Sequence, residues 1–320
     1  MKISTDKKEL HPRNRHREPY NFPELIKSLP ELGKFVTINK FNNESIDFSD
    51  PAAVLMLNRA LLRHFYGIVH WSIPEKYLCP PIPGRAEYIH RIADLLSFSN
   101  HGILPPGKAV KVLDIGVGAS CIYPILGNIA YGWKFVGSDI DPVAIKSAEQ
   151  IIASNDLLKG VVDCRLQKTS YNIFKGIIRE GELFDITVCN PPFHSSFAEA
   201  RSGTLRKWKN LGIARKNNAD QNFGGVFTEL VYKGGEEAFV SRMIEESALF
   251  STSVFWYSCL LSKSTSLPLV TKAVREAGVY DFNIIPIAHG NKVSRVVAWT
   301  FLTDMRQKEW RQKRWQVLNA

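Results

Sequence analysis

The sequence predicts an α/β fold in which helices cover both faces of a seven-stranded, mostly parallel sheet. Short apolar segments alternate with helical patterns from residue 110 onward, and this alternation is typical of a doubly wound parallel sheet. Only residues 288–293 join the last two expected strands. A crossover helix needs a dozen residues or more, so the final strand must turn back antiparallel.

The N-terminal third is expected to precede the sheet. Residues 1–49 show little periodicity and predict an extended basic arm, whereas residues 50–105 predict a helical part. Its first helix starts at Asp50-Pro51, with aspartate as the N-cap, and ends at Gly67. The second helix is expected from about Arg85 to Phe98, because apolar residues recur there at helical spacing.

Residues 106–303 are expected to form the sheet domain. Its strands are Val110–Ile115, Lys134–Ser138, Val161–Leu166, Phe184–Cys189, Val254–Leu261, Phe282–Ile287 and Ser294–Leu302. Helices are expected after Asp141-Pro142, at Gly235–Phe250 and at Leu267–Ala277, which Gly278 ends. We interpret residues 195–234 as a long basic insertion at the mouth of a site, and residues 304–320 as a basic C-terminal tail.

Composition limits the class of protein. The chain has 320 residues, with 41 lysines and arginines against 31 acidic residues, a formal net charge of +10. No run approaches the ~18 apolar residues of a membrane span, and the basic start lacks the apolar core of a secretory signal. The five cysteines form no CxxC pair, which argues against a zinc site or disulfide framework and fits a reducing compartment. We therefore expect a cytoplasmic monomer with no bound metal and no membrane contact.

The positive charge is clustered, and the clusters predict RNA binding. They lie in residues 1–20, 201–216 and 306–315, and the last two clusters include tryptophans. Cations neutralise phosphates and flat rings stack on unpaired bases. Any one cluster could be a solvated tail, but three favour a binding surface. The basic residues that we expect to contact RNA are Arg13, Arg15, Arg17, Arg206, Lys207, Lys209, Arg215 and Lys216.

A glycine-rich loop after the first core strand predicts a nucleotide cofactor. The strand runs into the sequence DIGVGAS, where Gly116 and Gly118 permit a sharp turn and close approach to a ligand. Asp139 ends the second strand and is placed to accept ribose hydroxyls. A dinucleotide fingerprint needs a third glycine, which is Cys121 here. Asp114 would repel a pyrophosphate yet tolerate an amino group and a sulfonium, so we predict S-adenosylmethionine.

The fourth strand ends in Asn190-Pro191-Pro192-Phe193, which predicts methylation of an amino group. An amine on an aromatic ring is a poor nucleophile because its lone pair is delocalised. If the Asn190 side chain and the Pro191 carbonyl each accept an N–H, the nitrogen becomes more tetrahedral and faces the methyl group, so Asn190 also borders the cofactor. The prolines stiffen the backbone, and Phe193 can stack on the target ring. A plain Pro-Pro turn is the alternative, but ligands of such sheets bind at this edge.

Five motifs together resemble the 23S rRNA (adenine(1618)-N6)-methyltransferase family, which is related to the eukaryotic methyltransferase-like RNA adenine-N6 enzymes. They are LHPRNRH at 10–16, PGR at 83–85, DIGVGASCIYP at 114–124, NPPF at 190–193 and GNKVSR at 290–295. The resemblance implies a class I methyltransferase fold and transfer of a methyl group from S-adenosylmethionine to N6 of an adenine in 23S rRNA, free or in a ribosome assembly intermediate.

The resemblance also implies roles for individual residues. Arg85 would reach the cofactor carboxylate, Gly116 and Ser120 would line its methionine side, Asp139 would bind the ribose, and Thr169 would lie beside the adenosine. The loop that holds Thr169 can obstruct the cofactor site in relatives. We therefore hypothesise that Lys168 gates this site, which predicts that a Lys168→Ala variant has an altered cofactor affinity.

Three alternatives stay open at this point. Protein glutamine N5-methyltransferases use the same Asn-Pro-Pro-aromatic motif but do not need basic clusters, so salt dependence of binding would separate them. DNA adenine methyltransferases carry a separate target-recognition domain, which is not evident here. A non-catalytic RNA-binding assembly factor would keep its role after an Asn190→Ala substitution.

Overall fold

The computed structural model describes residues 10–192, 231–289 and 292–316. A seven-stranded sheet with the order β5-β4-β3-β6-β7-β9-β8 forms its centre. The strands are β3 (Lys111–Ile115), β4 (Lys134–Asp139), β5 (Val162–Leu166), β6 (Phe184–Cys189), β7 (Val254–Leu261), β8 (Asp281–His289) and β9 (Lys292–Thr300). Strands β3 to β7 pair in parallel, whereas β9 pairs antiparallel with both β7 and β8. The predicted fold class is therefore confirmed, and no predicted strand boundary is more than two residues from the observed one.

Helices connect the strands and end where the capping residues indicate. They are α2 (Pro51–Tyr66), α3 (Ile82–Ser99), α4 (Ile122–Tyr131), α5 (Pro142–Ala153), α8 (Gly235–Ser247) and α9 (Leu267–Glu276). The Asp50 side chain accepts the Ala52 N–H at the start of α2, and Gly67 ends this helix in the left-handed region, with φ of 69°. Asp141 caps α5 in the same way through the Val143 N–H.

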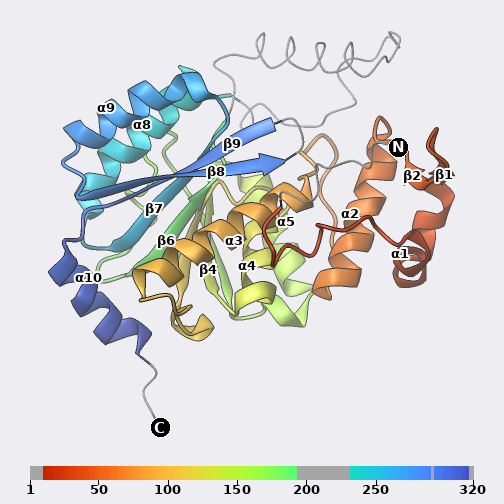
Figure 1. Cartoon of the computed structure of the whole chain (residues 1–320), viewed down its shortest axis with the longest axis horizontal. Helices are drawn as coiled ribbons and strands as arrows, with labels where there is room; N and C mark the ends of the chain where they lie inside the picture. The colour runs from red at the N-terminus through yellow and green to blue at the C-terminus, as the bar shows by residue number, and fades with distance from the viewer. Residues whose placement is uncertain (1–9, 193–230, 290–291, 317–320) are drawn as a thin grey trace.

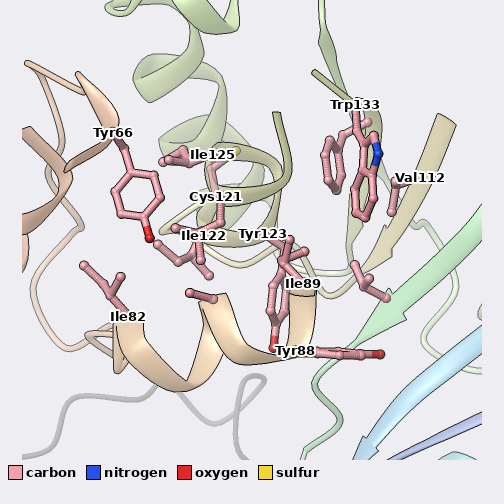
Figure 2. Packing of buried hydrophobic residues seen from close by; sticks show 14 of the residues in the cluster. Tyr66, Ile82, Tyr88, Ile89, Val112, Cys121, Ile122, Tyr123, Ile125 and Trp133 are labelled. Carbon is pink, nitrogen blue, oxygen red and sulfur yellow. The ribbon is translucent and has the colours of Figure 1, made fainter. Parts of the chain in front are cut away.

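Two apolar clusters cover the two faces of the sheet. Side chains of α3 to α5 pack on one face, with α2 packed against α4 in the same cluster, and those of α8 and α9 pack on the other face. Alternation along β3 sends Val112 to the first cluster and Leu113 to the second. Figure 2 shows part of the first cluster, with Trp133 beside Val112 and Tyr123 of α4 near Tyr88 of α3. No helix in the described part of the chain has the length and apolar character to cross a membrane.

The N-terminal segment differs from the extended arm that the sequence predicts. It contains α1 (Phe22–Ser28), a 3-10 helix (Pro30–Phe35) and a hairpin of β1 (Val36–Ile38) and β2 (Glu44–Ile46). Residues ahead of α1 pack on α3, where the buried Glu87 carboxylate accepts the His11 backbone N–H at 2.7 Å and the Asn14 side chain at 3.2 Å. The prediction of an extended arm was wrong because it overlooked an apolar pattern at helical spacing. Its members are buried in the first apolar cluster: Phe22, Leu25, Leu29 and Leu32. The residues ahead of α1 lack such a pattern and are held by the hydrogen bonds to Glu87.

The C-terminal tail also packs on the body of the protein. It forms α10 (Asp304–Trp310) and a π-helical turn (Arg311–Trp315). Both tryptophans are buried, and their indole N–H groups donate to Oδ1 of Asp185 at 2.8 and 2.7 Å. Arg314 forms an ion pair with the same carboxylate. Stacking of these two tryptophans on RNA bases was therefore a wrong interpretation, because their rings are part of the protein core.

Candidate active site

The loop after β3 leaves its backbone open toward a ligand. Gly116 and Gly118 have φ of 78° and 63°, a conformation that side chains disfavour. The N–H groups of Gly116 and Val117 donate to the Ser138 carbonyl at 2.8 and 2.9 Å, which ties the loop to β4. A Cβ on Gly116 would meet no atom within 4 Å among the described residues beyond its two chain neighbours. Open space beside a backbone that requires glycine is the arrangement that lets a ligand approach closely.

Asp139 lies at the end of β4 and is fixed by this loop. Its carboxylate accepts the Gly118 N–H at 3.0 Å and the Asp141 N–H at 2.9 Å. Burial raises the pKa of Asp139, and these two backbone hydrogen bonds oppose the increase. The carboxylate is held in one orientation and retains lone pairs that can accept ligand hydroxyls.

Asp114 is a buried carboxyl without a partner. It is fully buried, and neither oxygen accepts a hydrogen bond from any residue that the structure describes. Burial raises its pKa well above the ordinary value, the nearby Asp139 raises it further, and Arg85 lowers it. A buried polar group without a partner is costly in free energy. An ammonium group that reached this carboxyl would supply the missing donor, which makes Asp114 a candidate for the amino acid end of S-adenosylmethionine although it does not line the pocket described below.

Arg85 of α3 orients the side chain of Asn190. Its Nη1 donates to Asn190 Oδ1 at 2.9 Å and to the Tyr123 hydroxyl at 3.2 Å. A guanidinium can only donate, so this contact identifies the amide oxygen and fixes which way the amide faces. An amide oxygen has two lone pairs, and one therefore remains for a second donor.

One pocket at the carboxyl edge of the sheet collects most of the expected site residues. Those that line it are Arg85, Gly116, Gly118, Ser120, Asp139, Asn190 and Pro192. Asp114, Pro191 and Thr169 do not line it, although Ser170 and Asn172 in the same loop as Thr169 do. Phe193 lies outside the described residues. Within the described ranges, no three His, Cys, Asp or Glu side chains are grouped so that they could hold a metal ion.

Several residues that line the pocket were missed by the sequence reasoning. Tyr123, Ile140 and Asn172 follow the ends of β3, β4 and β5, so the rule that ligands bind at strand ends could have indicated them. Tyr232 and Phe239 form an edge-to-face pair with ring centroids 5.2 Å apart on another wall. No local pattern in the sequence indicated this pair.

The loop after β5 is held by one of its own side chains and by a carboxylate from α8. Gln167 accepts the Thr169 N–H at 3.1 Å and donates to the Lys175 carbonyl at 2.9 Å. The buried Glu246 of α8 accepts three consecutive backbone N–H groups, those of residues 173–175. Lys168 is exposed on this loop. Gating of the cofactor site by Lys168 stays a prediction.

The three N-terminal arginines expected to bind RNA take part in contacts within the protein or are partly buried. Arg13 pairs with Asp94, and Arg15 donates to the Phe65 carbonyl, although both side chains remain exposed. Arg17 is half-buried, and its Nε has no hydrogen-bond partner in the described segments. The other expected RNA-binding residues lie outside the described residues: Arg206, Lys207, Lys209, Arg215 and Lys216. Contact with RNA stays a prediction for all eight.

The sheet order and the position of the glycine loop and the Asn190 motif at its carboxyl edge are those of the class I methyltransferases, which use S-adenosylmethionine. Residues 4–303 match the model of a family described as RNA methyltransferase. The chain belongs to this family.

Curated relatives match the chain over nearly its full length. Ribosomal RNA large subunit methyltransferase F of Cytophaga hutchinsonii is 53% identical over 310 residues, which cover 97% of this chain and 96% of that protein. The protein of the same name from Photobacterium profundum is 52% identical over 332 residues, which cover 99% of this chain and 98% of that protein.

Solved structures of human METTL16 share the fold. Its catalytic domain in complex with MAT2A 3'UTR hairpin 1 is 31% identical and gives a TM-score of 0.77, over 92% of this chain and 96% of that one. Its N-terminal domain in complex with SAH is 29% identical with a TM-score of 0.72, over 92% and 99% of the two chains.

Proposed function

We propose that this chain transfers a methyl group from S-adenosylmethionine to N6 of an adenine in 23S rRNA, giving N6-methyladenosine. The observation that carries the proposal is Asn190 at the end of β6, with its amide oxygen oriented by Arg85 beside the glycine loop. The relatives at about half identity, which are named for large-subunit rRNA methylation, support the choice of RNA.

The residues around the loop suit each part of the cofactor. S-adenosylmethionine supplies a methyl group on a sulfonium, which makes the methyl carbon electrophilic. Asp114 would pair with its ammonium group and Asp139 with its ribose hydroxyls. Arg85 has five N–H donors, so it can bind the carboxylate through other N–H groups while Nη1 keeps its hydrogen bond to Asn190.

Asn190 would activate the target nitrogen by geometry. Its remaining lone pair accepts one N6–H, the Pro191 carbonyl accepts the other, and the nitrogen lone pair then faces the methyl carbon. Transfer would form the N–C bond as the C–S bond of the cofactor breaks, with the bonding electrons left on sulfur and the extra proton of the nitrogen released to solvent. The methylated nitrogen is acidic at this stage, so positioning and electrostatics supply most of the rate.

The adenine must reach this site as an unstacked base, so an unpaired adenine is a better substrate than one inside a helix. The net charge of +10 favours binding of the surrounding phosphates. We expect the protein to act as a monomer in the cytoplasm, where rRNA is made and assembled.

Methyl transfer from labelled S-adenosylmethionine tests the proposal. Protein-free 23S rRNA, 16S rRNA and a release-factor protein are offered in parallel, and the labelled products are digested to nucleosides or amino acids. We expect N6-methyladenosine from 23S rRNA alone. Label on the protein would instead support glutamine methylation, and label on neither RNA nor protein would contradict the proposal for free rRNA.

A further inference from the structure

We propose that Tyr88 is a positioning residue for methyl transfer, because its hydroxyl holds the backbone of Cys189 and thereby fixes the place of Asn190. This inference rests on the proposed function. Tyr88 lies on α3 and is fully buried in the first apolar cluster, and its side chain points away from the helix toward the end of β6 (Figure 2).

The Tyr88 hydroxyl lies where the pairing of β6 with β7 stops. These strands pair at Phe184 with Val254 and at Ile186 with Trp256, and no later pair is formed between them. On its other side, β6 stays paired with β3 up to Cys189. The N–H of Cys189 donates to the Tyr88 oxygen at 3.3 Å. A side chain therefore holds the last residue of β6, directly before Asn190.

The hydrogen bonds around this hydroxyl allow only one arrangement of protons. Ser258 Oγ donates to the Thr187 carbonyl at 2.5 Å, because a carbonyl can only accept. Tyr88 must then donate to Ser258 Oγ, which lies 2.8 Å away, and its oxygen is left to accept the Cys189 N–H. Burial raises the pKa of Tyr88 well above its ordinary value, so the hydroxyl keeps the proton that it donates.

Helix α3 thus holds the motif at two points. Arg85 bonds the Asn190 side chain, and Tyr88, three residues further along the same helix, bonds the backbone just before it. The rings of Tyr88 and Tyr123 meet edge to face at 5.5 Å, and Tyr123 accepts from Arg85. A shift of α3 would therefore move Arg85, which is expected to bind the cofactor, and Asn190, which is expected to bind the target base, at the same time.

Loss of the hydroxyl should displace the motif without removing any contact to the cofactor. In a Tyr88→Phe variant the Cys189 N–H loses its acceptor, and the end of β6 can relax toward β7. A displacement of about 1 Å in a reacting group can lower a rate about 100-fold. We expect kcat to fall roughly 10- to 100-fold, whereas the dissociation constant for S-adenosylmethionine should change less than about twofold because the loop, Asp139 and Arg85 are unaltered.

Tyr257→Phe is the matched control. Tyr257 is also fully buried, and its hydroxyl donates to the Phe250 carbonyl at 2.8 Å, away from the motif. Tyr88→Phe removes two hydrogen bonds, whereas Tyr257→Phe removes the single proton that its hydroxyl donates. Each substitution should therefore cost about 1–2 kcal/mol of folding stability. If Tyr88 only stabilises the fold, the two variants should have similar kcat.

The experiment measures kcat and KM for RNA at saturating cofactor, the cofactor dissociation constant by calorimetry, and urea unfolding. The expected result is a low kcat in Tyr88→Phe only, with cofactor affinity retained. Equal kcat in Tyr88→Phe and wild type, or an equal loss in Tyr257→Phe, would overturn the inference. Absence of transfer by the wild type would reject the proposed function itself. This outcome differs from those that overturn only the role of Tyr88, because there the wild type is active.

Ser258→Ala gives a second way to test the inference if Tyr88→Phe fails to fold. It removes the acceptor of the Tyr88 hydroxyl and frees that hydroxyl to rotate. We expect Ser258→Ala alone to lower kcat with cofactor affinity retained. Where both single variants fold, the double variant should show less than additive losses, since both substitutions act on one network. Wild-type kcat in Ser258→Ala, or fully additive losses, would contradict a shared role.

Discussion

Arg85 brings together three residues that lie far apart in the sequence. It donates to Asn190 and Tyr123, and its charge opposes the raised pKa of Asp114. Asn190 was predictable from the sequence because a polar residue in a stiff turn at a strand end is a local pattern. The contact that orients it was not, since Arg85 is 105 residues away in the chain. Sequence patterns therefore identify reactive groups more readily than the residues that position them.

At the scale of single residues, cofactor binding should depend on pH through Asp114. Its pKa is raised in the protein, and pairing with an ammonium group favours the ionised form, so binding should release a proton. Affinity for S-adenosylmethionine should therefore increase as the pH rises through the raised pKa of this carboxyl. An Asp114→Asn variant should bind roughly 10- to 100-fold more weakly and lose this pH dependence.

Calorimetry in buffers of different ionisation enthalpy measures both the affinity and the proton release. Wild-type affinity that is independent of pH, or proton release that persists in Asp114→Asn, would show that Asp114 does not bind the ammonium group.

At the scale of elements, the regular strands and helices were predictable, whereas the two ends of the chain were not. Each strand of the sheet is marked by a short apolar run between turn residues. The segment around His11 and Asn14 has no such period, and it is ordered by the buried Glu87 on a helix more than 70 residues away. In the sequence, the tryptophans near the C-terminus resemble an RNA-stacking motif. The structure shows instead that Asp185 accepts both of their indole N–H groups.

The contact between the N-terminal segment and α3 should make stability depend on pH. His90 of α3 stacks on His11 and bonds the Tyr131 hydroxyl at 2.7 Å. Burial, with the charges of His11 and Arg13, lowers the pKa of His90 from 6.5 to about 3. The unfolded chain therefore binds this proton at higher pH than the folded chain, and the stabilisation is present above pH 6.5 and decreases as the pH falls toward 3.

Urea unfolding at pH 7 and pH 5 tests this effect. From the two pKa values, His90 should account for a loss of about 2 kcal/mol of unfolding free energy between these conditions. A His90→Gln variant, which can still bond Tyr131, should lose correspondingly less stability than the wild type. An identical pH dependence in both proteins would contradict a neutral buried His90.

At Gly127, the steric cost of adding a side chain between α4 and β4 should exceed the gain in helix propensity. A Cβ at this position would lie 2.4 Å from the Phe135 ring. Gly127→Ala should therefore destabilise the protein by about 1–2 kcal/mol, although alanine favours a helix by about 1 kcal/mol over glycine. Gly84→Ala in α3 is the control, because a Cβ there meets nothing within 4 Å. Thermal unfolding measures both variants, and stabilisation of both would show that the Gly127 contact relaxes at no cost.

In the whole molecule, the carboxyl edge of the sheet determines where the site lies. Strands β3, β4, β5 and β6 all end at one pocket, so side chains from residues 85 to 190 line one cavity. The fold class, the cofactor and the motif at the fourth strand were predictable because they rest on local spacing. The wall formed by Tyr232 and Phe239 was not, since the segment before it has no strand pattern.

The central claim is that Asn190 takes part in methyl transfer to adenine in addition to bordering the cofactor. The most direct test compares single-turnover transfer to 23S rRNA by wild type and Asn190→Ala, with the cofactor dissociation constant measured for each. We expect Asn190→Ala to transfer the methyl group roughly 100- to 1000-fold more slowly, as for the loss of one positioned hydrogen-bonding group in an active site. Its affinity for the cofactor should be nearly unchanged. Transfer at the wild-type rate by Asn190→Ala would contradict the central claim.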